Sequence, residues 1–297
     1  MNSLFQKKSM NDISKSQWKF DKNQYGKFTP SRCDGISMEE ENKLRSDGIQ
    51  FIKNISVWLR LKHQTIATAT TYFHRFFMRC SFKDYTQHDI GAAATFLATK
   101  TTEHPRIIDY VAVACARVIR RDNNFYDADE FTKWIKIIIN KEKVLAEKIC
   151  FDFDVDLPHI HVVDFLENSS DIIITEKKKI ILIRMASLII SQTYNHPFCL
   201  YYTSKEIASS VLYISHKYIG LPVNENPLLG PTLWGIMESD VYAVHKCIND
   251  IFNTYPTPPR LKKVDNGLRD DNPLTNVVII FDDDHYATAT LRDETST

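Results

Sequence analysis

The chain has 297 residues, of which 43% are hydrophobic and 25% are charged. This composition is that of an ordinary globular protein, and the length suffices for one large domain or two smaller ones. Basic and acidic residues number 37 each, so no net charge favours nucleic acid or an anionic membrane as a partner. The eight glycines are fewer than an average chain of this length carries, which disfavours a turn-rich β fold.

The six cysteines form no CxxC pair, and several lie on apolar helical stripes. We therefore expect buried, reduced thiols in a nucleocytoplasmic protein. The N-terminal sequence MNSLFQKKSMNDISKSQWKF lacks the apolar core of a signal peptide. No apolar run reaches the roughly 18 residues of a membrane span, so we expect no membrane association.

Hydrophobic periodicity divides the chain into two sets of helices. Residues 1–37 are polar and rich in turn formers, which predicts an N-terminal extension. Five helices are then predicted, over residues 37–61, 64–80, 85–100, 106–121 and 129–150. After FDFDVDLP the pattern restarts, with helices predicted at HIHVVDFL, KKKIILIRMASLIISQTY, YTSKEIASSVLYISHK, a short segment near Leu233 and SDVYAVHKCINDIFNTY. We predict two five-helix units, over residues 38–155 and 156–255.

The helix predicted over residues 85–100 lacks a polar face. Thr86 and Asp89 begin it like a capping box, and the apolar run that follows is interrupted only by Thr95. A helix that is apolar on all sides is a buried one, and its glycine and alanines allow neighbours to approach closely. We expect a central helix surrounded by others, with Lys100 where the burial ends.

A second copy of this stretch lies 117 positions further along the chain, over residues 202–217. Four residues of the first copy recur at the same phase, as Tyr202, Thr203, Ile207 and Lys217. Buried helices resemble one another by chance, but the matched phase of cap, small residues and terminal lysine favours a duplicated unit. Internal repetition of this kind determines the fold.

Glu142 interrupts the apolar stripe of the helix predicted over residues 129–150. The stripe is otherwise formed by Phe131, Ile135, Ile138, Leu145 and Ile149. A carboxylate at such a position must reach solvent or be paired, because desolvating it alone is expensive. The candidate partner is Lys100. The two residues either form an internal bridge or mark an interface with another protein. The last helix of the second unit has no acid at the equivalent position, so we interpret Lys217 as a structural residue.

Motifs of catalysis are absent from the sequence. No GxGxxG, P-loop, GxSxG, HExxH or kinase motif set is present, so nucleotide binding and enzymatic activity are unsupported. His159 and His161 lie two positions apart and would not share a helix face, which favours loop or core histidines. The histidines and cysteines form no ligand cluster, and we expect no metal and no cofactor.

The C-terminal tail, residues 256–297, combines a linker with a short β-prone run. The sequence TPPRLKKVDNGLRDDNP reads as linker. Val277, Val278 and Ile280, followed by three aspartates, resemble a SUMO-interacting motif, which would add a strand to a partner's sheet. A strand docked on the protein's own body, or disorder, is the favoured alternative. Arg260 with Lys262 and Lys263 could form part of a nuclear import signal.

Four segments in order carry a resemblance to a known family: QWKF…FTPSRCDGIS, LRLKHQTIATATTYFHRFFMRCSF, AAATFLATKTTEHPR and EKVLAEKICFDFDV. They span about residues 17–155, with weaker similarity to about 255. The chain resembles the cyclins, and specifically the transcriptional cyclins T, K and L. The resemblance implies an all-α fold of two tandem five-helix cyclin boxes, with an N-terminal extension and a flexible tail.

The resemblance also implies a surface that binds a protein kinase. By position, this surface is formed by Lys100, Glu142, Leu97, Glu103, Ala146 and Phe151. A cyclin packs on the mobile αC helix of its kinase and holds it so that a glutamate there can pair with the ATP-positioning lysine. In relatives the sequence after the central helix is often KVEE. Here only the second of the two acids is present, as Glu103, which leaves the identity of the partner kinase open.

We therefore expect a non-catalytic subunit that binds a cyclin-dependent kinase as a heterodimer in the nucleus. Through that kinase it would act on the C-terminal domain of RNA polymerase II and promote transcription elongation. Residues 44–48, LRSDG, lack the apolar pattern by which cell-cycle cyclins dock substrates. The alternative is a DNA-associated cyclin-fold factor resembling transcription factor IIB, but that class carries a zinc ribbon and a basic face, and neither is visible, so we expect no direct DNA binding.

Overall fold

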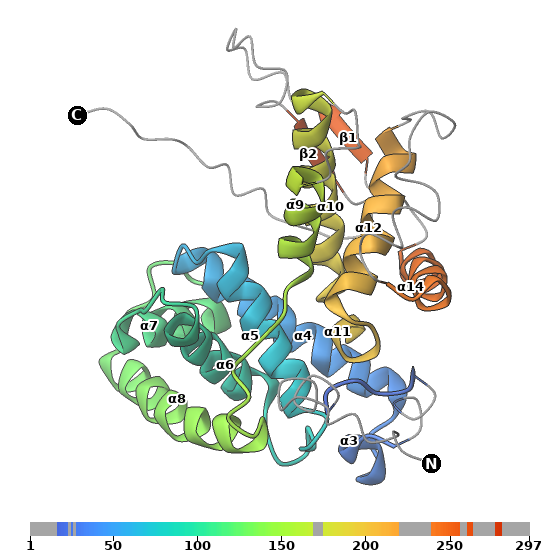
Figure 1. Cartoon of the computed structure of the whole chain (residues 1–297). Coiled ribbons are helices and arrows are strands. Elements are labelled where there is room, and N and C mark those ends of the chain that lie inside the picture. Colours follow the sequence, from blue (N-terminus) through green and yellow to red (C-terminus); the bar gives the residue numbers. More distant parts are fainter. Residues whose placement is uncertain are drawn as a thin grey trace, which may run out of the picture. The chain divides into compact units, whose positions relative to one another are not determined.

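The computed structural model describes residues 17–22, 25, 28–168, 175–219, 239–255, 260–263 and 277–280. These residues are predominantly α-helical, which confirms the predicted all-α fold class, and two short strands lie in the C-terminal part (Figure 1). The chain divides into two compact units, Met1–Cys247 and Ile248–Thr297. No described helix is long and apolar enough to cross a membrane.

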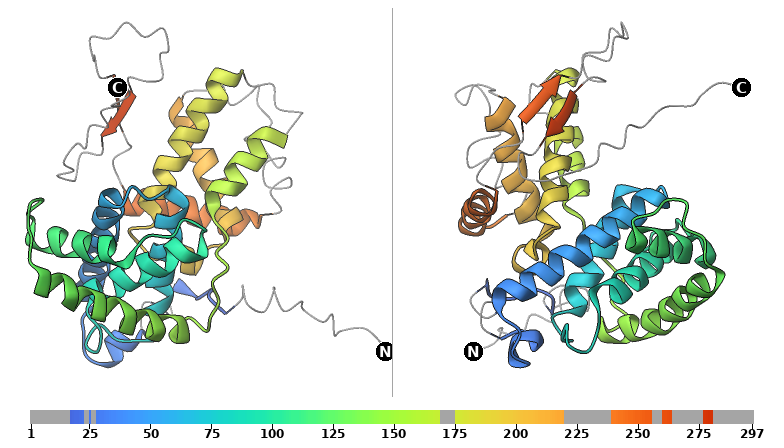
Figure 2. Two further views of the ribbon diagram at one scale, coloured as in Figure 1. Left: turned by 90° about the vertical axis from the view of Figure 1, so that its left-hand side faces the viewer. Right: turned by 180° about the vertical axis from the view of Figure 1, so that it is seen from behind.

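The five helices predicted in the first half of the chain are present within a few residues of their expected bounds. After a short helix α3 (Pro30–Cys33) come α4 (Met38–Trp58), α5 (His63–Phe76), α6 (Gln87–Thr101), α7 (Ile108–Arg120) and α8 (Ala128–Lys148). Helix α6 contacts the other four longer helices and is central, as its sequence indicates. Seen from behind, α4 runs diagonally across this group (Figure 2).

Side-chain caps fix where α4 and α6 begin. The hydroxyl of Ser37 accepts a hydrogen bond from the backbone N–H of Glu40 at 3.1 Å and so caps α4. Thr86 caps α6 in the same way, through the N–H of Asp89 at 3.2 Å. Each cap satisfies a donor that the helix itself leaves unpaired, and is worth about 1 kcal/mol. The cap predicted at Thr86 is therefore confirmed.

Helix α5 is more deeply buried than its sequence suggests. The apolar spacing predicts one inward face, yet every residue from Ala67 to Phe76 is buried, threonines included. Contacts from the second half of the chain cover the polar side: α11 (Phe198–Tyr201) packs against α5, and Nε2 of His74 lies 3.0 Å from the carbonyl oxygen of Tyr194. Burial lowers the pKa of His74 to about 3, so the ring is neutral.

The second half of the chain supplies a further set of helices. Besides α11, they are α9 (Pro158–Asn168), α10 (Glu176–Thr193), α12 (Ser204–Ile219) and α14 (Val241–Thr254). Helix α14 spans the boundary between the two units, and the helix predicted near Leu233 lies outside the described residues. The duplicated capping box at the start of α12 is complete, because the N–H of Glu206 donates to Oγ1 of Thr203 at 3.2 Å and the N–H of Thr203 donates to Glu206 Oε2 at 2.7 Å.

Two strands pair in the C-terminal unit. Strand β1 (Arg260–Lys263) runs antiparallel to β2 (Val277–Ile280), with residue 262 opposite 278. The prediction of linker for residues 257–273 is therefore wrong at 260–263. The sequence RLKK has little β preference of its own, and its extended conformation comes from pairing with the β-branched run VVII, which local sequence does not reveal.

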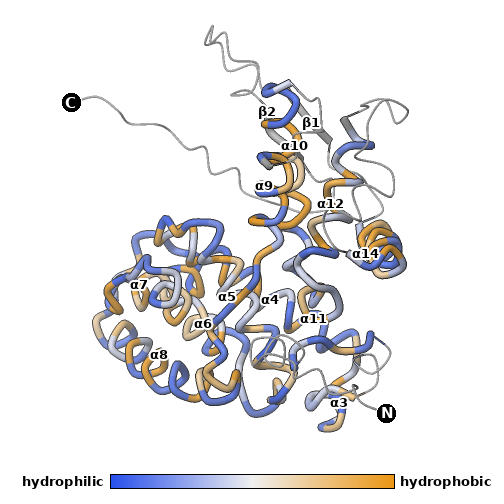
Figure 3. The backbone as a smooth tube through the Cα atoms, in the orientation of Figure 1, coloured by the Kyte–Doolittle hydropathy of each residue, from blue (hydrophilic) through white to orange (hydrophobic). Residues whose placement is uncertain are grey.

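Hydropathy along the chain follows this packing. Along α8 the colour of the tube changes repeatedly between hydrophobic and hydrophilic (Figure 3), as expected for a helix with one buried side. One core cluster joins the inner faces of α4, α5, α6 and α8, and contains Phe73, Phe76 and Phe77 with Leu97 and Ile149. The end of α6 and the end of α8 are thus tied to the same core.

Gly48 on α4 is required by this packing. A Cβ added there would lie 2.3 Å from Cζ of Phe73, a fully buried ring that packs edge-to-face on Phe77, with the ring centroids 4.9 Å apart, and has little room to move away. We expect Gly48→Ala to lower the free energy of unfolding by about 1–3 kcal/mol, in spite of the better helix propensity of alanine. Urea unfolding followed by circular dichroism measures the change.

Gly91 on α6 provides the matched control for this variant. A Cβ there would meet its nearest atom, Cδ1 of Phe51, at 3.1 Å, which a small shift relieves. Gly91→Ala should therefore lose less stability than Gly48→Ala. Equal stability of the two variants would contradict the packing argument.

Candidate functional site

Lys100 and Glu142, singled out from the sequence, meet at the protein surface. Nζ of Lys100, at the end of α6, forms an ion pair with Oε1 of Glu142 on α8. The lysine side chain is 45% exposed and the glutamate side chain 18%. The ammonium group also lies 4.3 Å from the ring centroid of Phe96, one helical turn earlier. The two residues therefore bridge each other in the chain alone, while the lysine remains accessible.

The position of Glu142 follows from how α8 packs on α6. Ile138 and Leu145 are fully buried on either side of it, so the apolar stripe is real and the carboxylate is held at its edge. An ion pair with one partner half exposed contributes about 0–1 kcal/mol to stability. Stability alone is thus a weak reason for an acid at this position.

The other four predicted site residues differ in exposure. Phe151 is 64% exposed, and its N–H donates to the carbonyl oxygen of Ala146 at 2.8 Å. Glu103 is exposed in the turn after α6, and its N–H donates to the carbonyl oxygen of Lys100 at 3.3 Å. Leu97 and Ala146 are buried, at 6% and 8% exposure, and offer little area to a partner. The accessible groups are therefore the lysine, the glutamates and the phenylalanine.

Tyr72 on α5 fixes the ends of α6 and α8 relative to each other, a role that the sequence did not reveal. Its hydroxyl lies 2.8 Å from the carbonyl oxygen of Phe153, to which it donates, and 3.0 Å from Oγ1 of Thr101. Burial raises the pKa of Tyr72, which keeps the hydroxyl protonated as the donor. The tyrosine thus joins the last residue of α6 to the segment that follows α8.

Arg75 and Trp18 hold that same segment from the other side. Nη1 of Arg75 donates to the carbonyl oxygen of Asp152 at 3.0 Å, and the indole N–H of Trp18 donates to the Asp152 carboxylate at 2.9 Å. The Arg75 guanidinium lies 5.1 Å from the Trp18 ring centroid. A signal for this face was present in the sequence, because Tyr72 and Arg75 lie three positions apart and so share one face of the predicted helix.

Potential metal ligands do not gather anywhere in the described part of the chain. There, no group of three or more His, Cys, Asp or Glu side chains is close enough together to hold a metal ion. His161 instead contacts Oδ1 of Asp156 at 2.7 Å. Burial lowers the pKa of His159 to about 4. At Lys100 and Glu142 the structure instead presents a half-exposed ammonium group paired with a carboxylate.

Sequence comparisons agree with the resemblance. A model of the cyclin N-terminal domain matches residues 17–144. Cyclin pch1 of Schizosaccharomyces pombe is 34% identical over 198 residues, which cover 66% of this chain and 56% of that protein. Cyclin-K of Homo sapiens is 29% identical over 215 residues, covering 72% of this chain and 36% of that protein. The chain thus spans about a third to somewhat over half of the length of these relatives.

Solved structures share the fold. A chain of the yeast RNA Pol II CTD kinase CTDK-1 complex aligns with a TM-score of 0.66 at 18% identity, over 80% of this chain and 72% of that chain. A chain of the CAK complex of Chaetomium thermophilum bound to ATP-gamma-S aligns with a TM-score of 0.62 at 14% identity, over 82% and 81%. Residues 17–144 of the chain thus match the cyclin N-terminal domain, and the chain shares its fold with subunits of these kinase complexes.

Proposed function

We propose that the chain is the regulatory subunit of a cyclin-dependent kinase that phosphorylates the C-terminal domain of RNA polymerase II. The observation that carries the proposal is the Lys100–Glu142 pair, which joins the end of α6 to α8 and leaves the lysine accessible. The names of the relatives support it, since they include cyclins of the K and T types, and a structural neighbour belongs to a Pol II CTD kinase complex. The nucleus is the corresponding location.

The mechanism proposed is allosteric. Lys100, Glu142 and Glu103 offer polar contacts to the kinase, and the exposed ring of Phe151 offers a large apolar one. Because the ion pair is already formed in the free chain, these groups need little rearrangement on binding. Docked on the kinase αC helix, the surface would hold that helix in the position that completes the ATP site.

In this assignment the first cyclin box, residues 38–155, binds the kinase, and the second, residues 156–255, supports it. Phosphoryl transfer occurs on the kinase, and the chain itself is not catalytic. Its sequence has no glycine-rich loop to cradle a nucleotide, which is consistent with this division of roles.

Purification of the tagged full chain with its bound partners tests the proposal. We expect a protein kinase, identified by mass spectrometry, in about equal amount. The kinase with this chain should phosphorylate a peptide of RNA polymerase II C-terminal repeats at least about 10-fold faster than the kinase alone, since ordering the ATP site is what activation supplies. The chain alone should transfer no phosphate.

Two outcomes of this experiment would contradict the proposal. Phosphate transfer by the chain alone would make it an enzyme. A purified chain without any kinase, but with DNA binding that weakens steeply with salt, would favour the factor IIB-like alternative.

A further inference from the structure

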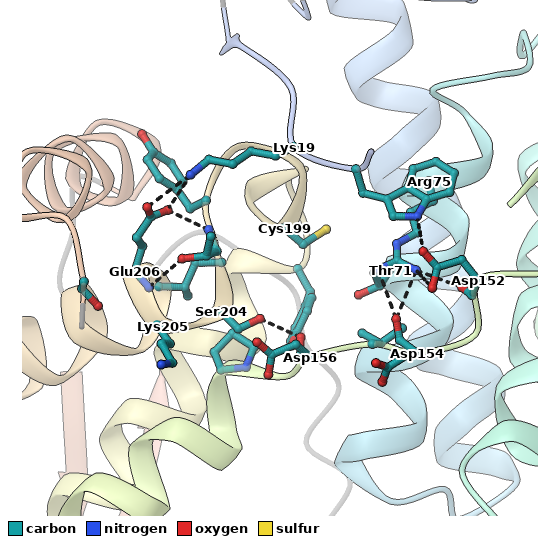
Figure 4. Close-up of a pocket in the computed structure, with 18 of the residues that line it drawn as sticks. Lys19, Thr71, Arg75, Asp152, Asp154, Asp156, Cys199, Ser204, Lys205 and Glu206 are labelled. Atoms are coloured by element: carbon teal, nitrogen blue, oxygen red, sulfur yellow. Dashed lines mark hydrogen bonds and ion pairs between the residues drawn. The ribbon is translucent and has the colours of Figure 1, made fainter. Parts of the chain in front are cut away.

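A pocket of about 440 Å³ lies within the Met1–Cys247 unit and has no role in the proposed kinase contact. It is bounded by the segment after α8, the start of α12 and the N-terminal segment that carries Trp18. Figure 4 shows Lys19 and Glu206 on one side, Arg75 and Asp152 on the other, and the sulfur of Cys199 between them. Its size suits a long side chain together with part of a peptide backbone.

Negative charge prevails in this pocket. Five carboxylates line it, against three cations, a formal excess of two negative charges; the carboxylates are Asp152, Asp154, Asp156, Glu206 and Asp240. Two of the cations are already paired: Arg75 lies 3.9 Å from an Asp152 oxygen, and Lys19 lies 3.2 Å from a Glu206 oxygen. The pocket therefore attracts a further cation and repels phosphate and nucleic acid.

Asp154 is the carboxylate most free to bind that cation. It is exposed, and its backbone carbonyl, rather than its carboxylate, receives the hydrogen bonds from Arg75 at 3.4 Å. Among the described residues its carboxylate forms no ion pair. Cys199 adds no charge, because burial raises the pKa of its thiol to about 11.

Aromatic and aliphatic side chains form part of the remaining lining, beside hydroxyl groups. Trp18, Tyr194, Tyr202, Val155 and Ile207 contribute to it. An aromatic wall beside carboxylates matches an arginine side chain, whose guanidinium pairs with a carboxylate and stacks on a ring. Arg75 already does both within this structure, against Asp152 and Trp18.

We propose that this pocket binds a basic, extended peptide segment of a partner protein, with an arginine side chain placed against Asp154 and an apolar neighbour on the aromatic wall. Asp152, Asp154 and Asp156 follow Phe151 directly in the sequence, so the bound segment would lie next to the proposed kinase surface. A partner or substrate with such a segment would be held close to the kinase. The binding itself belongs to this chain and does not depend on the kinase assignment.

Fluorescence anisotropy of the full chain with labelled hexapeptides tests the proposal. The peptide GRLRFG should bind, with an affinity that falls as salt rises, and its charge-reversed form GELEFG should not. Asp154→Asn should weaken binding of GRLRFG about 3- to 10-fold, as expected for a lost partly exposed ion pair. Lys205→Ala, which removes a lining cation, should instead tighten it about 2- to 5-fold.

Matched surface variants control for net charge. Asp164→Asn on α9 and Lys178→Ala on α10 change the charge by the same amounts at exposed positions outside the pocket lining, and should leave the affinity unchanged. Equal binding of the two peptides, no binding of either, or equal effects of the pocket and control variants would each overturn the proposal. Circular dichroism of every variant confirms that it is folded.

Discussion

Exchanging the two charges, in the double variant Lys100→Glu with Glu142→Lys, is expected to abolish kinase binding while the chain remains folded. The exchanged residues can still form an ion pair at the same place, so the internal contact between α6 and α8 is retained. A kinase residue that meets the lysine would instead meet a carboxylate. Replacing a charge in a desolvated contact costs about 2–5 kcal/mol, which corresponds to an affinity loss of at least about 30-fold.

The measurement is a titration of immobilised kinase with each variant, together with its circular dichroism spectrum. Replacing both residues by alanine should lose binding to a similar extent. Lys217→Ala on α12 is the matched control, because Lys217 lies 4.9 Å from the ring of Tyr213 much as Lys100 lies 4.3 Å from Phe96. It should bind the kinase as the unmodified chain does.

The exchange separates the two explanations of the pair. If Lys100 and Glu142 only brace α6 against α8, the exchanged variant restores binding that the alanine variant loses. If the alanine variant unfolds, the bridge is structural and the surface assignment is wrong. Neither result is expected, because the lysine side chain is 45% exposed and such a pair contributes little to stability.

Local sequence predicts most of what determines the shape of this surface. Periodicity and capping rules apply to residues that are close together in the chain. They predict the apolar run of α6, its cap at Thr86 and the apolar stripe of α8. The same rules isolate Glu142 as an anomaly. A buried stripe with one acid leaves few possible partners, and Lys100 at the end of the neighbouring helix is one of them.

Contacts between distant segments are what local sequence could not show. The apolar spacing of α5 predicts one inward face, but contacts from the second half of the chain bury its threonines as well. Leu97 and Ala146, assigned to the kinase surface by resemblance, lie largely in the core. The hydroxyl of Tyr72 reaches the Phe153 carbonyl across 81 positions of sequence, and no spacing rule extends that far.

Glu41 is the clearest case of a residue whose role the sequence did not reveal, and its replacement is expected to have a large effect on stability. With Glu39 and Glu40 it reads as an acid favoured at the start of a helix. In the structure it is fully buried, and its carboxylate accepts hydrogen bonds from Arg45 at 2.8 Å and from the hydroxyl of Thr29 at 2.5 Å. A third group, Nε of Arg32, lies 3.3 Å from it.

Glu41→Ala should therefore destabilise the chain severely. Arg45 is 1% exposed, and without the carboxylate its charge would stay buried beside the ring of Tyr25 and the Phe77 carbonyl that it also contacts. Removing one member of a buried ion pair costs about 3–5 kcal/mol. For a domain of about 150–250 residues this corresponds to a fall in Tm of about 6–20 °C, measurable by thermal unfolding.

Glu40→Ala is the control that isolates burial from helix-end electrostatics. Glu40 precedes Glu41 by one position, lies in the same first turn of α4 and is exposed. Its replacement loses the same favourable interaction with the helix dipole, about 0.3–1 kcal/mol, and nothing else. Equal losses in the two variants would show that the buried network adds no stability. The expected excess for Glu41→Ala would show that this network holds α4 against the segment around Thr29, and so fixes the helix on which α6 packs.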